Sequence, residues 1–144
     1  MLFRSVEVFE ETFVKKLQIE ARVIGDICLN HIIPAATAYL NVLATNLSTG
    51  RDVFGDEAGA LCRASGQTYR KIAGLINSLS DAVAALVEER RKANHIPDIS
   101  ERARLYSTAV MDAMNRVRES ADNLEMLVDD AYWPLPKYRE LLYL

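Results

Sequence analysis

"LQIEARVIGDICLNHIIPAATAYLNVL", residues 17–43, carries apolar side chains three and four positions apart along its whole length. That spacing places an apolar stripe along one side of a helix, where it faces a partner helix. The stripe consists of Leu17, Ala21, Ile24, Cys28, His31, Ala35, Ala38 and Val42. A second stripe beside it predicts a second neighbour and consists of Leu29, Ile33, Ala36, Leu40, Leu43 and Leu47.

Signals at the helix ends divide the chain into three long helices. We expect these helices at residues 7–47, 56–94 and 99–129, followed by a tail at 130–144. No long stretch alternates between apolar and polar residues with period two, as a half-buried strand does. The sequence therefore predicts an all-α fold, an elongated antiparallel three-helix bundle that ends in a hook and a short helix, within a single domain.

Particular residues set the expected helix ends. Pro34 removes one backbone donor, so the first helix is expected to kink near Asn30. Gly50 suits the left-handed position that closes this helix. Asp98 and Glu101 have the spacing of a capping box at the start of the third helix.

Composition excludes several classes of function. The chain has 144 residues, 26% of them charged, with a net charge of −3, so nothing in it indicates a nucleic-acid partner. No apolar run approaches the length of a membrane span, and acidic residues follow the N-terminus too early for a secretory signal. Cys28 and Cys62 lie within helical patterns and lack metal-ligand spacing. We expect two reduced thiols in a cytoplasmic protein.

Catalytic and metal-binding patterns are not found in the sequence. His31 lies in an apolar stripe with no glutamate three residues away, so we interpret it as a structural or interface histidine. Neither cysteine has a histidine nearby, and the six glycines form no phosphate-binding loop. Asp129 and Asp130 precede the tail, where we expect them to form turn hydrogen bonds. We predict no catalytic, cofactor-binding or metal-binding residue in this chain.

The tail is the unusual part of the sequence. Its two prolines restrict the backbone and lower the entropy that docking would cost. The candidate docking residues are Trp133, Pro134, Leu135, Pro136, Tyr138, Arg139 and Leu142. A stiff segment rich in large aromatic side chains is typical of a docking element. The sequence leaves open whether it docks on its own chain or on another subunit.

"LEMLVDDAYWPLPKYRELLYL", residues 124–144, closely resembles the C-terminus of type III glutamine synthetases. Those enzymes share "WPLPKYRELL" and commonly end in a single phenylalanine, where this chain has Tyr143 and Leu144. "IEARVIGDICLNHIIPAATAYLNVL" and "LVEERRKAN" also resemble segments of that family. Matching positions in the first of these two segments include Gly25, His31 and Pro34.

The resemblance implies a role that the stripes alone do not give. Type III glutamine synthetases join ammonia to glutamate with ATP and Mg²⁺ or Mn²⁺, in a catalytic domain whose motifs do not occur here. The matched region implies a non-catalytic helical domain that serves subunit packing and oligomer assembly. Its expected partners are the catalytic domain of the enzyme and neighbouring subunits. The alternatives are a free-standing helical adaptor that binds a partner protein and, less favoured, a metal or cofactor enzyme built in a bundle core.

Overall fold

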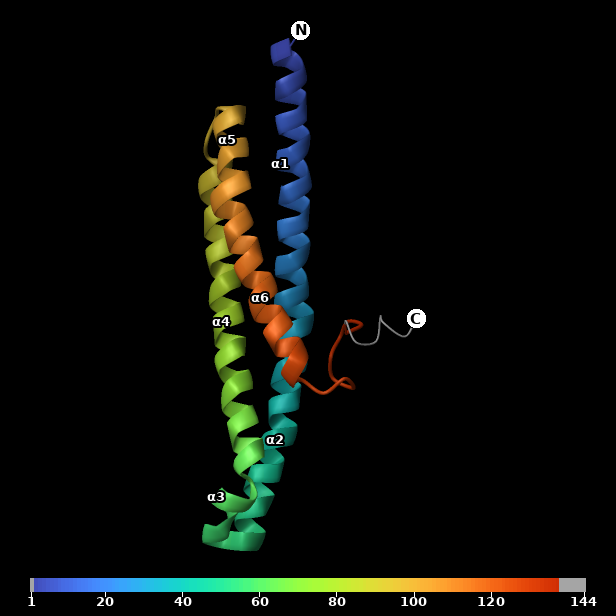
Figure 1. The fold of residues 1–144 in the computed structure, drawn as a ribbon, viewed down its shortest axis with the longest axis vertical. Helices are drawn as coiled ribbons and strands as arrows, with labels where there is room; N and C mark the ends of the chain where they lie inside the picture. The colour runs from blue at the N-terminus through green and yellow to red at the C-terminus, as the bar shows by residue number, and fades with distance from the viewer. Residues whose placement is uncertain (1, 138–144) are drawn as a thin grey trace.

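The computed structural model of the chain describes residues 2–137, and every regular element among them is helical (Figure 1). The elements are α1 (Leu2–Ile27), η1 (Cys28–Ile32), α2 (Ile33–Phe54), η2 (Gly55–Glu57), α3 (Ala58–Leu61), α4 (Arg63–Asn94), α5 (Ile99–Leu105), η3 (Tyr106–Val110) and α6 (Met111–Leu127). Two of the short elements, η1 and η3, are π turns, and η2 is a 3₁₀ turn. The all-α prediction is confirmed.

The helices form three long rods whose directions alternate (Figure 1). The first rod contains α1, η1 and α2, the second contains α4, and the third contains α5, η3 and α6. Helix α4 packs extensively on both α2 and α6, whereas α1 contacts mainly α5 and meets α4 and α6 only sparsely. Helix α1 is therefore enclosed less completely than α4.

The buried face of the first rod changes at the π turn η1. Before this turn, Leu17 and Ala21 of the first predicted stripe are buried. After it, Val42 of the same stripe is 43% exposed, whereas Ala36 and Leu40 of the second stripe are buried. A π turn holds more residues than an α turn, so it rotates the side chains that follow around the helix axis. The prediction that one stripe faces the core along the whole helix is wrong.

The first rod ends at Gly55 rather than near Gly50. Helix α2 continues to Phe54, and Gly55 has a φ of 57°, in the left-handed region that suits glycine. Gly50 is buried inside α2, where a Cβ atom would lie 2.6 Å from Sγ of Cys62. The predicted helix end at residue 47 is therefore wrong. Gly50 does not cap the helix; it lets α2 approach Cys62 closely.

A hydrogen-bonded joint connects α4 to α5. The Asp98 carboxylate accepts a hydrogen bond from the backbone N–H of Glu101 at 3.0 Å, as the expected cap requires. Oδ1 of Asn94 accepts hydrogen bonds from the Tyr106 hydroxyl at 2.6 Å and from Nε2 of Gln18 at 3.0 Å. Tyr106 is fully buried, so its hydroxyl needs such a partner. Asn94 thereby links all three rods.

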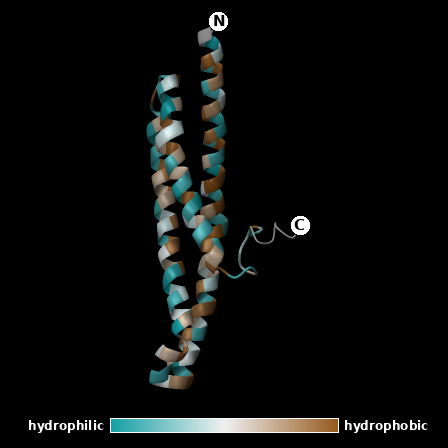
Figure 2. Cartoon of the chain, in the orientation of Figure 1, coloured by the Kyte–Doolittle hydropathy of each residue, from teal (hydrophilic) through white to brown (hydrophobic). Residues whose placement is uncertain are grey.

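The apolar core follows the rods and includes one face of the third rod. The buried residues of that face lie mostly three and four positions apart: Ala103, Tyr106, Val110, Ala113, Val117, Leu124 and Val128. Hydropathy drawn along the ribbon shows apolar segments recurring in all three rods, including the N-terminal part of α1 (Figure 2). One helical stretch, within Arg4–Leu61, is long and apolar enough to cross a membrane, but core helices of soluble proteins have the same composition. The prediction that no apolar run approaches the length of a membrane span is therefore wrong, whereas the expected absence of a membrane partner stays a prediction.

Candidate docking site

The tail begins with a turn that Asp129 holds. Helix α6 ends at Leu127, and the next residue, Val128, has an extended backbone with φ −81° and ψ 135°. Oδ1 of Asp129 accepts a hydrogen bond from the N–H of Ala131 at 2.8 Å. The carbonyl of Asp129 accepts two more, from the N–H groups of Tyr132 and Trp133 at 2.9 and 3.1 Å. An aspartate that bonds the backbone two residues on is a common turn former, so this side chain reverses the chain after α6.

Two aromatic side chains bring the tail back to its own chain. Trp133 is 9% exposed and belongs to the same apolar core cluster as Leu124 and Val128. The ring of Tyr132 lies 5.7 Å from that of Tyr39 in α2, centroid to centroid, with the planes inclined by 44°. This distance is within the range in which aromatic pairs attract. The tail is therefore docked in cis as far as these residues.

Lys137 fixes the far end of this segment. Its side chain is 7% exposed, and its ammonium group donates a hydrogen bond to the carbonyl of Val128. The same nitrogen lies 2.8 Å from Oδ1 of Asp130 and 5.9 Å from the ring centroid of Trp133. A buried charge is tolerated only when it is paired and hydrogen-bonded, and these contacts supply both conditions. Sequence reasoning did not identify Lys137, because the turn that brings it to Asp130 leaves no periodic signal.

The remaining tail residues face outward. Pro134 and Pro136 are exposed, and Leu135 is 40% exposed. The described tail thus has an inner side, anchored by Trp133 and Lys137, and an outer side made by the Pro-Leu-Pro sequence. Three further candidates, Tyr138, Arg139 and Leu142, lie outside the described residues, as does the short helix expected there. The complete hook stays a prediction.

A hollow of about 590 Å³ lies beside the tail. Its lining includes Tyr39, Met126, Asp130 and Lys137, and Met126 is 83% exposed. Within residues 2–137, no three His, Cys, Asp or Glu side chains are grouped so that they could hold a metal ion. The hollow is also lined by Asp122, Glu125 and Asp129, so its wall combines carboxylates with apolar side chains.

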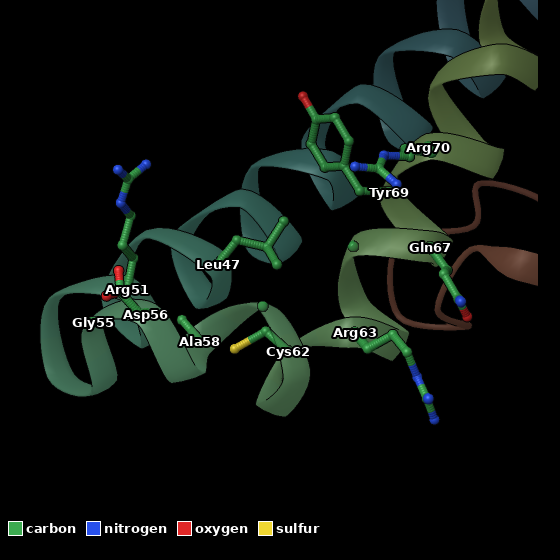
Figure 3. Close-up of a pocket in the computed structure, with 12 residues that line it drawn as sticks. Leu47, Arg51, Gly55, Asp56, Ala58, Cys62, Arg63, Gln67, Tyr69 and Arg70 are labelled. Carbon is green, nitrogen blue, oxygen red and sulfur yellow. The ribbon is translucent and has the colours of Figure 1, made fainter.

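A second hollow, of about 560 Å³, lies near α3, at the C-terminal end of the first rod (Figure 3). Leu47 and Cys62 line it together with several arginines, but Arg51 and Arg63 point in different directions. An anion site would need these guanidinium groups to converge. The view in Figure 3 shows no such convergence among the labelled residues.

His31 lies on the surface of the π turn η1. The prediction that it belongs to a buried stripe is wrong, for the same reason that the stripe changes at this turn. Pro34 stands in the first turn of α2 and is exposed, and the expected irregularity near Asn30 is the π turn itself. The amide of Asn30 donates to Oδ1 of Asp26 at 2.5 Å.

Cys28 is the more deeply buried of the two thiols. It is 2% exposed, and burial raises its pKa from the ordinary value of 9.0 to about 11, because burial disfavours the thiolate. A reactive cysteine needs a lowered pKa. Cys28 therefore serves as a core residue, whereas Cys62 is only partly buried and lines the second hollow.

Comparison with known proteins gives consistent matches. A family model described as "Glutamine synthetase C-terminal domain" matches residues 2–51. A glutamine synthetase of Bacteroides fragilis (strain YCH46) is 37% identical over 139 residues, which is 96% of this chain and 19% of that protein. A type-3 glutamine synthetase of Dictyostelium discoideum is 26% identical over 144 residues, with the same two coverages. The chain spans about a fifth of the length of the curated relatives it matches.

The fold and the docked part of the tail define an all-helical chain segment. Residues 2–51 are similar to the glutamine synthetase C-terminal domain, and the resemblance to type III glutamine synthetases seen in the sequence is confirmed.

Proposed function

We propose that this chain is the non-catalytic helical C-terminal domain of a type III glutamine synthetase and that it serves subunit packing and oligomer assembly. One observation carries the proposal: nearly the whole chain aligns with glutamine synthetases, yet it covers only about a fifth of their length. In this proposal the helices act together as an elongated antiparallel three-helix bundle.

Uncovered apolar side chains support the assembly role. Large apolar residues at least half exposed include Val8, Phe9, Ile19 and Val23, all on α1. Contiguous apolar surface on a folded chain commonly marks a site of protein–protein contact. The outer side of the tail adds Leu135 to this surface. Neighbouring subunits or the catalytic domain would cover these groups.

The activity of the whole enzyme is part of the same proposal. The complete protein would join ammonia to glutamate with ATP, in the cytoplasm. ATP and Mg²⁺ or Mn²⁺ would bind in a catalytic domain outside these residues. The present chain would hold that domain in its oligomer and contribute no reacting group.

A chimera tests the assembly role. The region of the Bacteroides fragilis enzyme that matches this chain is replaced by residues 1–144, and a second variant lacks the region altogether. We expect the chimera to form the same oligomer as the parent enzyme in mass photometry and to retain glutamine synthesis. The deletion variant should show smaller particles. An oligomer of parental size without the region would contradict the proposal.

An assay of the chain alone tests the non-catalytic role. Purified residues 1–144 with Mn²⁺, ADP, arsenate and glutamine should form no γ-glutamyl hydroxamate from hydroxylamine. Measurable transfer would show that the chain is itself an enzyme. If the chain instead remains monomeric and the chimera fails to assemble, the adaptor alternative becomes the better reading.

A further inference from the structure

The chain continues from the wall of the hollow beside the tail. Lys137 lines this hollow and is the last residue that the structure describes. Its buried side chain is held by the carbonyl of Val128 and by Asp130, so the C-terminal segment, residues 138–144, starts at the wall of the hollow. Seven residues reach about 10 Å as a helix and about 23 Å when extended. The hollow is therefore within reach of the C-terminal segment of its own chain.

Part of the lining of this hollow is apolar and uncovered. Met126, in the last turn of α6, is 83% exposed, more than any other large apolar side chain that the structure describes. Tyr39 of α2 and Leu127 line the same hollow and are half-buried. Removing such side chains from water is favourable, so the hollow suits an occupant with apolar groups.

The hollow is also acidic. Its lining includes four carboxylates and the ammonium group of Lys137, a net charge of −3. Asp122 is exposed, so water screens its charge, whereas Glu125 is half-buried. Glu125 stands in the last turn of α6, which contains no basic residue, although the negative end of a helix dipole favours a cation there. A positively charged group in the occupant would therefore be stabilised beside Glu125.

The C-terminal segment, YRELLYL, carries both features. In the short helix that the sequence predicts there, Tyr138, Leu141 and Leu142 lie within about 100° of one another, on one side of the helix. Arg139 flanks this side, about 60° from Leu142, whereas Glu140 points about 160° away from Leu142. The cation thus accompanies the apolar side, and the anion faces away from it.

We propose that the C-terminal segment packs back into this hollow in cis, with Leu142 on Met126 and the Arg139 guanidinium bonded to Glu125. Trp133 and Lys137 already hold the preceding residues on the same chain, so the segment has little further entropy to lose when it docks. The inference goes beyond the assembly role, because it assigns this hollow to the chain itself and removes it from the surface that other subunits contact.

Oxidation of Met126 tests whether the segment covers the hollow. Hydrogen peroxide converts methionine to its sulfoxide, and covering the side chain slows the reaction. The 144-residue chain is compared with a chain that ends at Lys137, and peptide mass spectrometry distinguishes Met126 from fully buried Met114, the internal reference. Met126 should oxidise several-fold more slowly in the 144-residue chain. Equal rates would overturn the inference.

Charge reversal tests the pairing without a deletion. Arg139→Glu and Glu125→Arg should each raise the oxidation rate of Met126 toward that of the shortened chain, because like charges then meet in the hollow. The double variant should restore slow oxidation. Glu140→Arg is the matched control and should leave the rate unchanged. A double variant that oxidises as fast as the single variants would overturn the inference.

Dilution distinguishes this occupant from the same segment of a second copy. Protection within one chain does not depend on concentration, so the ratio of rates should be the same at about 1 μM and about 100 μM. Protection that fades on dilution would show that a neighbouring copy fills the hollow, and the inference would be wrong. The chimera above tests the assembly role separately, because none of these rates requires an oligomer.

Discussion

The side chain of Trp133 connects the tail to the core. It is 9% exposed, within the apolar cluster of the rods, and the ammonium group of Lys137 lies over its ring. The aromatic body is thus removed from water while the lysine charge keeps Asp130 as a partner. Trp133 is thus the apolar anchor of residues 128–137, beside the contacts that Tyr132 and Lys137 make.

Replacing the indole tests this attachment. Trp133→Ala should lower the free energy of unfolding by about 3 to 5 kcal/mol, because it removes a large buried side chain and leaves a cavity. Urea denaturation followed by circular dichroism measures the change. Leu135→Ala, at a position 40% exposed, is the control and should cost below about 1 kcal/mol. An unchanged midpoint for Trp133→Ala with a smaller oligomer would show that the tail docks between subunits instead.

The small size of Gly50 lets α2 lie close to Cys62, which stands between α3 and α4. A Cβ at this position would meet Sγ of Cys62 at 2.6 Å, closer than a normal contact. We expect Gly50→Ala to lower the free energy of unfolding by about 1 to 2 kcal/mol, since overpacking outweighs the gain in helix propensity. In a Cys62→Ala background the same change should become stabilising. A thermodynamic double-mutant cycle measures the coupling.

Gly74 is the matched control for this substitution. It lies in α4, is exposed, and has nothing within 4 Å of its Cβ position. Gly74→Ala should stabilise the chain by about 0.5 to 1 kcal/mol through helix propensity alone. Equal effects at both glycines would mean that the close approach at Gly50 is absent.

The Cys28 thiol predicts a dependence on pH. Folding raises its pKa from 9.0 to about 11, so the folded chain keeps a proton that the unfolded chain loses. The stabilising contribution is complete below pH 9 and is lost as the pH rises toward 11.

At pH 8 the thiolate fraction of Cys28 is about 100-fold lower than for an ordinary thiol. Iodoacetamide should therefore label half-buried Cys62 first, and Cys28 only in urea; rapid labelling of Cys28 in the folded chain would contradict its burial.

Among the elements, the π turns explain where sequence reasoning succeeded and where it failed. The helical spacing of apolar residues identified the three rods, because burial on one face imposes that spacing. The same spacing gives two stripes in the first rod. The stripe that contains Leu17 is buried before η1, and the stripe that contains Ala36 is buried after it. A π turn depends on how the rods pack together, so the local pattern around Cys28 could not reveal it. The exposure of His31 was missed for this reason.

The α4–α5 joint was easier to predict because its signal is local. Asp98→Ala removes the acceptor for the Glu101 N–H and should cost about 1 kcal/mol of unfolding free energy. Asp122→Ala, at an exposed position inside α6, should not lower stability and is the control. Chemical denaturation of both variants checks the difference. Equal effects would indicate that the cap contributes nothing at this joint.

At the scale of the whole molecule, length and function are connected. The first rod runs without a break from Leu2 to Phe54, and α4 alone has 32 residues. Long rods expose much surface for their volume, which suits a domain that contacts several neighbours.

The tail motif identified the family from sequence, since its proline and aromatic pattern is specific. The surfaces were not predictable in the same way, because exposure of α1 depends on which rods cover it.

The shape itself is the last prediction. At 1.5 Å per residue, a rod from Leu2 to Phe54 is about 80 Å long. A compact domain of this chain length would have a radius of gyration of about 15 Å. Small-angle X-ray scattering of the monomeric chain should therefore give a maximum dimension of about 80 Å and a radius of gyration well above 15 Å. A dilution series checks that the scattering comes from the monomer. A radius near 15 Å would mean that the rods fold back on one another in solution, and the uncovered side of α1 would then already be covered within the same chain.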